Sequence, residues 1–500
     1  MRKLAVAWLM ACIGLAAQEL GTISFPNSGS PAVQTKFIEG VKDLHSFEFD
    51  EAGAAFRQAQ QLDPNFALAY WGEAMSYNHP LWAQQDLAAA RKTLLSLAPT
   101  LEGRIAKAPT EKEKGYLDAV NQLFYAPGDK LERDNAYSNA MGRLHDQWPE
   151  DHEIAIFYAL SLLGTVRPGD HGFRRQALAA SIAIKVFEAN PNHPGAAHFI
   201  IHSFDDPDHA ILALPAARVY ARIAPSAPHA LHMPSHIFLQ LGLWQDVVAS
   251  NVVAYKAATD LLARMHLPEG REDFHTLSWL EYGNLMLGKF DDARANVDLA
   301  KLAADRNAHN ANIGGQYHTM LARYILETGK WEKIPLEGAQ QAAAGHESMP
   351  GMAGMGGYAG QTSWIFIAGL SAAKLGDKNE AERACVELGS VRKRMESTGE
   401  AYAAKQVNIM EKELASAVEA TQGRKAEAVL LAKEAADLEA TLSAPSGPPD
   451  PIKPALEFYG ETLLAAGKSA EAANAFQQQL FRTPKRTPSI NGLALALAAH

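Results

Sequence analysis

One spacing of small and aromatic residues, found near both ends of the chain, constrains the fold more than any other feature. In "FIEGVKDLHSFEFDEAGAAFRQAQQLDP" it consists of Gly40, Ala52, Phe56, Ala59 and Pro64. In "EFYGETLLAAGKSAEAANAFQQQLFRTP" the matching residues are Gly460, Gly467, Ala472, Phe476 and Pro484. Self-similarity of this kind predicts a repeat architecture. The chain is 47% hydrophobic and rich in alanine, which favours packed helices.

Weaker copies of the pattern, with a turn glycine followed by second-helix alanines, occur at Gly288, Gly376 and Gly423, and Gly329 marks one more turn. The spacing resembles that of the tetratricopeptide repeat (TPR) family, and the resemblance covers most of residues 34–499. It implies an all-α fold, an α-solenoid of helix-turn-helix units that forms a right-handed superhelix with a concave groove. A single helical hairpin cannot bury its own apolar face, so neighbouring units must stack.

The resemblance and the breaks in it predict the domain organisation. The predicted segments are a signal peptide (1–17), N-terminal TPR-like repeats (34–165) with a degenerate insert (81–134), central His-rich repeats (175–343), a Met/Gly-rich loop (344–360), further repeats (361–442), a Pro-rich linker (443–454), and a C-terminal repeat with a capping helix (455–500). Within the insert, we expect longer helices with a charged surface.

The first residues are typical of an export signal. Arg2 and Lys3 precede an apolar run over 4–15, and Ala16-Ala17 offers a small-residue cleavage site. We therefore expect a periplasmic or secreted protein. A buried N-terminal helix is the alternative, and a lipoprotein cleavage box before Cys12 fits less well.

Charge and hydropathy exclude two classes of partner. The 46 basic residues do not outnumber the 56 acidic ones, and a net charge of −10 leaves no cationic excess to neutralise phosphates. We therefore expect no nucleic-acid partner. No later segment has about 20 uninterrupted apolar residues, so we expect no membrane span.

Two histidine pairs stand one repeat length apart in the middle of the chain. His198 and His202 are four residues apart, and His232 and His236 repeat that spacing 34 residues later. On a helix, Cβ atoms four residues apart lie about 5–6 Å from each other, a geometry that lets two imidazoles share one ion. The spacing predicts a four-imidazole site for a transition metal: copper, zinc or iron.

The TPR resemblance implies that these histidines face the concave groove, together with His229 and, in the next unit, His275. Asp205 or Asp206 is a candidate metal ligand or a partner that orients a ring. The alternative is that the histidines are ordinary hydrogen-bonded helix residues.

Pro234 complicates the second pair. Inside a helix, proline removes one backbone hydrogen bond and kinks the chain. It can instead begin a helix, and we expect that arrangement to turn His232 away from His236.

The Gly-rich segment contains thioethers at three-residue intervals. Its candidate soft-metal ligands are His346, Met349, Met352 and Met355. Thioethers suit Cu(I), and "HESMPGMAGM" resembles the methionine motifs of periplasmic copper-handling proteins. The alternative is a linker whose methionines pack against the repeats.

Three classes of function follow from these observations. The leading hypothesis is an exported, non-catalytic scaffold that holds a protein, a peptide or a small ligand in its groove, with Trp71, Asn78 and Tyr282 as further groove residues. The second is an enzyme that uses a metal at the histidines, and the third is a copper-binding or copper-delivery protein. The sequence lacks the common hydrolase, zinc-protease and phosphate-loop motifs, and it assigns no residue a catalytic role.

Overall fold

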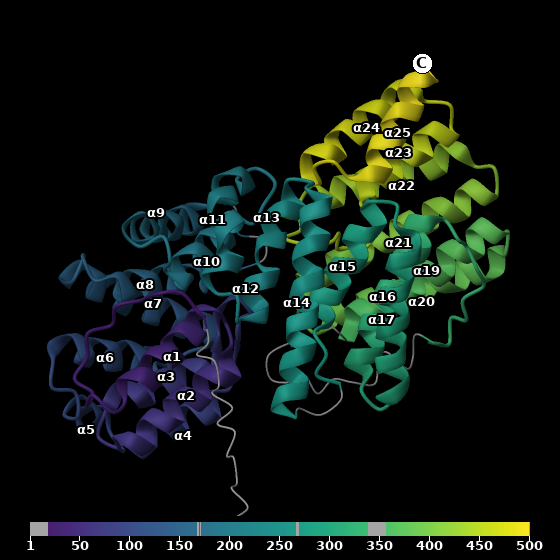
Figure 1. The fold of residues 1–500 in the computed structure, drawn as a ribbon. Helices are drawn as coiled ribbons and strands as arrows, with labels where there is room; N and C mark the ends of the chain where they lie inside the picture. Colours follow the sequence, from purple (N-terminus) through teal and green to yellow (C-terminus); the bar gives the residue numbers. More distant parts are fainter. Residues whose placement is uncertain (1–18, 168–169, 171, 267–269, 339–356, 500) are drawn as a thin grey trace, which may run out of the picture.

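The computed structural model describes residues 19–167, 170, 172–266, 270–338 and 357–499. Nearly all regular structure in these ranges is α-helical, and each helix packs mainly against the next along the chain. The colours of Figure 1 accordingly pass in order across the molecule, from purple to yellow. The predicted all-α solenoid of helical hairpins is confirmed. In the described ranges, no helix is both long and apolar enough to cross a bilayer.

The N-terminal part forms its own hydrophobic core, which includes Phe37, Phe56 and Tyr116. Its helices are α1 (Gln34–His45), α2 (Phe49–Leu62), α3 (Ala67–Ser76), α4 (Leu87–Leu97), α5 (Leu101–Ile105), α6 (Glu111–Tyr125), α7 (Lys130–Gln147) and α8 (His152–Leu163). Between α3 and α4 lie a two-residue antiparallel pair, β1 (Asn78–His79) and β2 (Gln84–Gln85), and the 3-10 turn η1 (Pro80–Trp82).

The central part contains all the predicted metal-ligating histidines that the structure describes. Its helices are α9 (Arg174–Ala189), α10 (Pro194–Ser203), α11 (Ala210–Ile223), α12 (Pro228–His232), α13 (Pro234–Gln240), α14 (Trp244–Met265), α15 (Phe274–Met286), α16 (Phe290–Arg306) and α17 (Ala311–Thr328). Pro234 does begin a helix. However, Met233 keeps helical dihedrals (φ −53°, ψ −36°), so α13 continues the path of α12.

The C-terminal part continues the stack with α19 (Gly357–Leu375), α20 (Lys378–Ser397), α21 (Ala401–Thr421), α22 (Lys425–Glu439), α23 (Ala455–Ala465), α24 (Ser469–Arg482) and α25 (Thr487–Ala498). The C-terminal end of the array contacts the central part. Trp244 Nε1 of α14 donates to the Lys485 carbonyl, between α24 and α25, at 2.9 Å. The Thr487 hydroxyl likewise donates to the Met286 carbonyl of α15 at 2.6 Å.

Glycines of the repeat motif allow close helix contacts at both ends of the chain. A Cβ added to Gly40 would lie 2.9 Å from the Phe56 ring, and one added to Gly460 would lie 2.8 Å from the Phe476 ring. These pairs hold matching places in the two sequence copies. The turn glycine Gly467 has φ +81°, a left-handed conformation that favours glycine.

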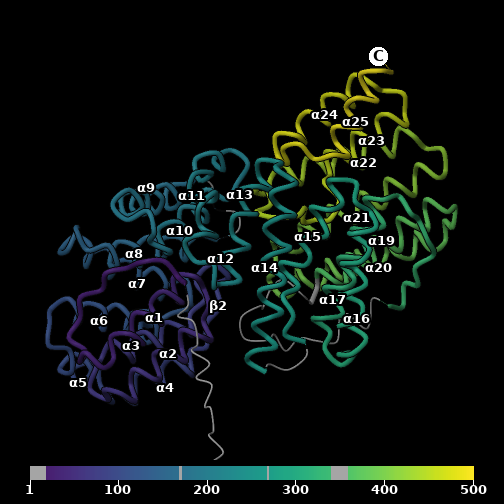
Figure 2. Tube along the Cα trace, in the orientation of Figure 1, coloured from purple at the N-terminus to yellow at the C-terminus, as the bar shows by residue number. Residues whose placement is uncertain are grey.

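Contacts between distant segments surround the central helices. The C-terminal end of α1 packs against α10, an approach that can be followed in the tube of Figure 2. The Pro-rich segment 443–454 reaches α13, where Gln240 Nε2 donates to the Pro445 carbonyl at 2.9 Å. A simple one-dimensional stack would show neither contact.

Candidate metal centre

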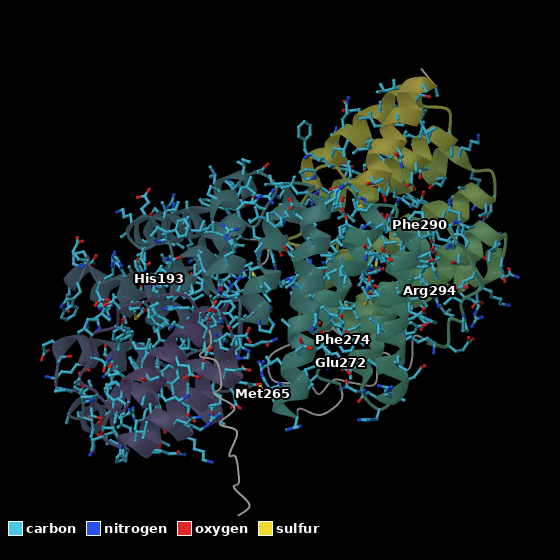
Figure 3. The ribbon with its side chains drawn as sticks, viewed as in Figure 1. His193, Met265, Glu272, Phe274, Phe290 and Arg294 are labelled. Atoms are coloured by element: carbon cyan, nitrogen blue, oxygen red, sulfur yellow. The ribbon has the colours of Figure 1, made fainter. Side chains whose placement is uncertain are left out.

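Six histidines from four helices converge in two groups of three. The first trio consists of His198, His202 and His229, and the second of His232, His236 and His275. Within each trio, one ring nitrogen of every residue lies within 4.8 Å of the other two. In Figure 3, the labelled His193 precedes α10 and the labelled Phe274 begins α15, the first and last helices that contribute.

Helical phase explains why these rings meet. His198 and His202 are the fifth and ninth residues of α10, and His232 and His236 take the same places when residues are counted from Pro228. His275 is the second residue of α15. The rings of His232 and His236 face each other despite Pro234, with Nε2 atoms 3.1 Å apart. The expectation that a helix starting at Pro234 would separate them is wrong, because the helical path is continuous.

In the first trio, one ring is fixed by a backbone carbonyl. His198 Nδ1 lies 2.6 Å from the His45 carbonyl oxygen, which can only accept, so Nδ1 carries the proton. The Nε2 lone pair of His198 therefore points at Nε2 of His202 (3.0 Å) and Nε2 of His229 (3.2 Å). One lone pair is thus aimed at two neighbouring nitrogens.

In the second trio, two rings are fixed in the same way. His232 Nδ1 donates to Asn251 Oδ1 at 2.6 Å, and Asn251 Nδ2 donates to the Val247 carbonyl, which sets the amide orientation. His236 Nδ1 donates to Asp205 Oδ2, also at 2.6 Å. Both Nδ1 atoms carry protons, so two Nε2 lone pairs face each other at 3.1 Å. Such a contact is repulsive unless a cation, either a proton or a metal ion, lies between them.

The spacing of these nitrogens fits ligation. Imidazole nitrogens bind Zn²⁺ at about 2.0–2.1 Å. Two such ligands 3.0–3.2 Å apart then subtend about 90–105° at the ion, a range between octahedral and tetrahedral angles. Rings whose Nδ1–H is held by an oxygen acceptor are also the usual form of metal-ligating histidine.

Burial keeps the rings neutral. His198 and His232 are at most 1% exposed and His236 is 8% exposed, while the other three rings are half-buried. The pKa values of His198 and His275 are lowered to about 3, mainly by burial and in part by the neighbouring His236 imidazole. The pKa values of His202, His229 and His232 are also well below the usual range, mainly through burial. Protons therefore compete little for the lone pairs at neutral pH.

One aromatic ring covers each trio. The Phe47 ring lies 4.4, 5.7 and 5.4 Å from the rings of the first trio, measured between centroids. The Trp279 ring lies 4.3 to 5.5 Å from those of the second trio. Phe47 has φ +58°, a left-handed conformation that costs energy for a residue with a side chain. The strained backbone of Phe47 thus holds its ring over the three imidazoles of the first trio.

A third buried group, formed by His45, Glu153 and His193, lies beside the first trio. It contains two imidazoles and a carboxylate that bind one another. The Glu153 carboxylate lies 2.7 Å from His45 Nε2 and 3.1 Å from His193 Nε2. Burial alone would raise the pKa of Glu153, but the attraction of the two rings holds it at about 2. His193 Nδ1 accepts from the Ala196 amide at the start of α10, so its Nε2 donates to Glu153. Glu153 of α8 thus connects the end of α1 to the start of α10, while His45 Nδ1 is buried without a hydrogen-bond partner.

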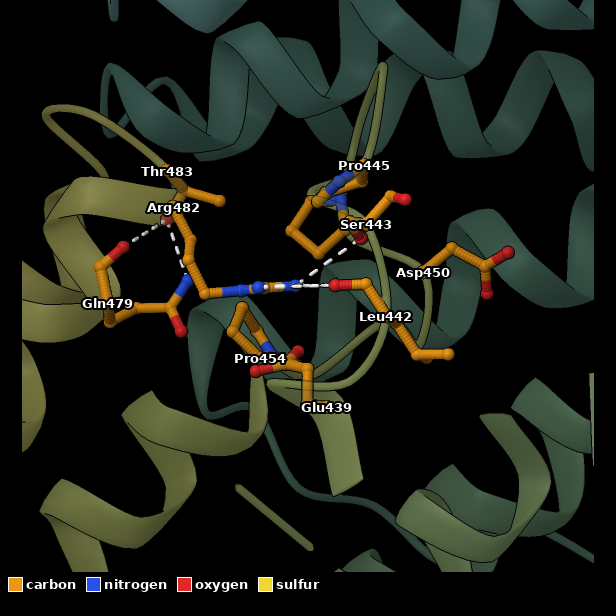
Figure 4. Close-up of a pocket in the computed structure, with 10 residues that line it drawn as sticks. Glu439, Leu442, Ser443, Pro445, Asp450, Pro454, Gln479, Arg482 and Thr483 are labelled. Atoms are coloured by element: carbon orange, nitrogen blue, oxygen red, sulfur yellow. Dashed lines mark hydrogen bonds between the residues drawn. The ribbon is translucent and has the colours of Figure 1, made fainter. Parts of the chain in front are cut away.

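The Pro-rich segment packs against residues that contact the second trio. A Cβ added to Gly447 would lie 2.7 Å from the Trp279 ring. Gln240 also connects this segment to Asp205, with Nε2 3.4 Å from Asp205 Oδ1. Figure 4 shows how the segment is held on its other side, where the Arg482 guanidinium donates to the carbonyls of Leu442 and Ser443. None of the six histidines lines the pocket drawn there.

The structure changes the predicted grouping. In place of one four-imidazole site, His229 completes a trio with the first pair and His275 completes one with the second. Asp205 orients the His236 ring. Asp206 instead accepts from His209 Nδ1 at 2.9 Å, so its prediction as a partner of this cluster is wrong.

The other predicted groove residues are placed elsewhere. Trp71 is 0% exposed in the N-terminal core, and the Tyr282 hydroxyl accepts from the buried Arg486 guanidinium at 3.1 Å. Asn78 is 3% exposed, and its Oδ1 accepts from Lys130 Nζ. All three are buried, so their prediction as residues of an open groove is wrong. The soft-metal ligands His346, Met349, Met352 and Met355 lie outside the described residues.

Sequence reasoning missed the residues that orient the rings. The His45 carbonyl is a backbone atom 153 residues from its partner, and Asn251 lies in the middle of a long helix. Neither carries a recognisable motif. One sequence signal was available: a polar residue at a helix position where the pattern predicts a buried apolar one, such as His45 near the end of α1.

Comparisons with known proteins leave the family open. No family model matches the chain, and no curated protein matches it. Among solved structures, yeast Tom70 is similar with 11% identity and a TM-score of 0.33, over 93% of this chain and 88% of that one. The human IFIT1 dimer with m7Gppp-AAAA has 13% identity and a TM-score of 0.32, over 91% of each chain. Similarity at this level carries no conclusion about what this chain binds.

Proposed function

We propose that this protein is a helical-repeat scaffold that binds transition-metal ions, one at each histidine trio. The observation that carries the proposal is the facing pair of lone pairs at His232 and His236. Their Nδ1 protons are committed to Asn251 and Asp205, which leaves the two Nε2 atoms 3.1 Å apart without a proton between them unless one ring is doubly protonated. A metal ion relieves that contact.

The ligand set narrows the choice of ion. Imidazole suits copper, zinc, iron and nickel, whereas calcium and magnesium prefer oxygen ligands. Each trio supplies three nitrogen ligands. Asp205 is not counted as a ligand, because its carboxylate accepts a hydrogen bond from His236. Copper and zinc therefore fit best. Export to the periplasm or beyond, and a protein or peptide partner for the repeats, remain proposals based on the sequence.

Metal content of the full-length protein tests the proposal. Untagged protein, purified without chelators and loaded with Cu(I) or Zn²⁺, should contain two ions per chain by plasma mass spectrometry. His202→Gln should retain one ion and His275→Gln one, because each variant disables one trio while changing only a half-buried ring. His309→Gln alters an exposed histidine outside the cluster and should retain two.

Two outcomes would overturn the proposal. The wild type, folded by circular dichroism, could bind no ion under these conditions. Alternatively, the two cluster variants could bind as many ions as His309→Gln does. The facing nitrogens would then be held by a proton on His236, with Asp205 as its counter-charge.

A further inference from the structure

The two trios lie side by side as one continuous cluster. Across the boundary, the ring centroids of His202 and His236 are 5.9 Å apart, and those of His229 and His232 are 6.3 Å apart. Within a trio, the widest centroid separations include 6.4 Å for His202–His229 and 6.0 Å for His236–His275. The gap between the trios is thus no wider than the widest ring separation inside them. Two bound ions would be neighbours.

Charge decides what such a pair can be. All six ligands are imidazoles, which bind a metal ion in their neutral form and so bring no negative charge. Two divalent ions would place four positive charges together in a largely buried site, and burial of unpaired charge is costly. The nearby carboxylates include Asp205, on His236, Glu48, which accepts from the His229 amide, and Asp273, which accepts from the His275 amide. Two monovalent ions halve the charge, and Cu(I) is the monovalent ion that imidazole binds.

Each ion would also have a vacant coordination position. Three nitrogens are available per trio, one fewer than tetrahedral coordination requires. The covering rings of Phe47 and Trp279 contribute no ligand atom to either trio. The fourth position of each ion is therefore open to a small external ligand.

We propose that the two trios hold two Cu(I) ions as one dinuclear centre that binds dioxygen between them. This inference rests on the proposed metal-binding function and adds the identity of the ion and of its ligand. Each Cu(I) gives one electron, so two Cu(I) become two Cu(II) and O₂ becomes a bridging peroxide dianion. No proton or outside reductant is needed. The total charge of ions plus dioxygen is +2 before and after the step, so the buried site gains no charge when it is oxidised.

Anaerobic loading followed by oxygen tests this inference. Full-length protein carrying two Cu(I) per chain is mixed with air-saturated buffer while an electrode records oxygen. We expect one O₂ taken up per two copper ions and an intense near-ultraviolet absorption from peroxide-to-Cu(II) charge transfer. We also expect almost no Cu(II) electron-paramagnetic-resonance signal, because the bridged spins couple. Removal of oxygen under vacuum should bleach the absorption.

Variants separate a pair of ions from two isolated ones. His275→Gln should bind one Cu(I) and take up less than a tenth of the wild-type oxygen, although its first trio is intact. His309→Gln should behave as the wild type. If both copper ions bind and oxygen yields the resonance signal of isolated Cu(II), or no oxygen is taken up, the dinuclear inference is wrong and the metal-binding proposal stands. If no copper binds but Zn²⁺ does, only the dinuclear inference fails. If neither ion binds, the metal-binding proposal itself fails.

Discussion

Asn251→Leu should weaken metal binding at the second trio alone. Asn251 Oδ1 accepts the Nδ1 proton of His232 at 2.6 Å, while its amide donates to the Val247 carbonyl. Leucine has a similar size but no acceptor. The His232 proton is then free to move to Nε2, the atom that faces His236. A ring protonated at Nε2 cannot bind an ion there.

Loss of such an orienting partner typically reduces metal affinity about 10–100-fold, which corresponds to about 1.4–2.7 kcal/mol. Competition with a chromophoric chelator measures the two affinities separately. We expect the first ion to bind as in the wild type and the second to bind 10–100-fold more weakly. Asn251→Asp, which keeps an acceptor oxygen, should restore the affinity.

Asn284→Leu is the matched control for this variant. Asn284 is also a buried helical asparagine, 4% exposed, but its amide donates to Asn296 and contacts no histidine of the cluster. It should lose stability and keep both affinities. If Asn251→Leu binds both ions as tightly as Asn284→Leu does, ring orientation by Asn251 does not create the site.

Three further predictions concern the scaffold. Burial raises the pKa of Asp43 to about 8, so the folded state holds a proton that the unfolded state releases near pH 4, and stability falls as pH rises from about 4 through 8. In the wild type this loss is about 1.4 kcal/mol of unfolding free energy per pH unit, and Asp43→Asn should abolish it. The measurement is the urea midpoint of both proteins at pH 5, 7 and 9, and an equal pH dependence in the two would contradict the prediction. Glu457→Gln should cost about 3–5 kcal/mol in urea unfolding, because Arg486 is fully buried against that carboxylate at 2.8 Å; an unchanged midpoint would refute it. Gly460→Ala should cost about 1–3 kcal/mol, since its Cβ would meet the Phe476 ring at 2.8 Å, whereas Gly314→Ala, with open space in α17, should not destabilise.

Local periodicity made the helical fold predictable. The interval from Gly460 to Phe476 places the glycine against the ring of the facing helix, and the same interval recurs at Gly40 and Phe56. Helical phase also brought His198 next to His202, because residues four apart share a helix face. These relations operate over one hairpin and can be seen in one sequence.

Relations between distant units could not be predicted in this way. The repeat spacing orders units along a line, and gives no sign that the His45 carbonyl would meet His198. The same limit explains why Trp71 was predicted to face the groove. It is buried instead, because Phe25 and Tyr116 from other segments pack against it. The grouping into two trios depends on how α12 and α15 are placed side by side, which is a matter of packing between hairpins.

The contacts around the cluster also determine when it can be completed during synthesis. The ribosome makes the His45 carbonyl long before His198 emerges, so the N-terminal hairpins can already be folded when that ring arrives. The Pro445 carbonyl that holds Gln240 follows 205 residues later. Until that segment has left the ribosome, Gly447 cannot pack against the Trp279 ring beside the second trio. The surroundings of the second trio are therefore completed later in synthesis than those of the first, when the Pro-rich segment arrives.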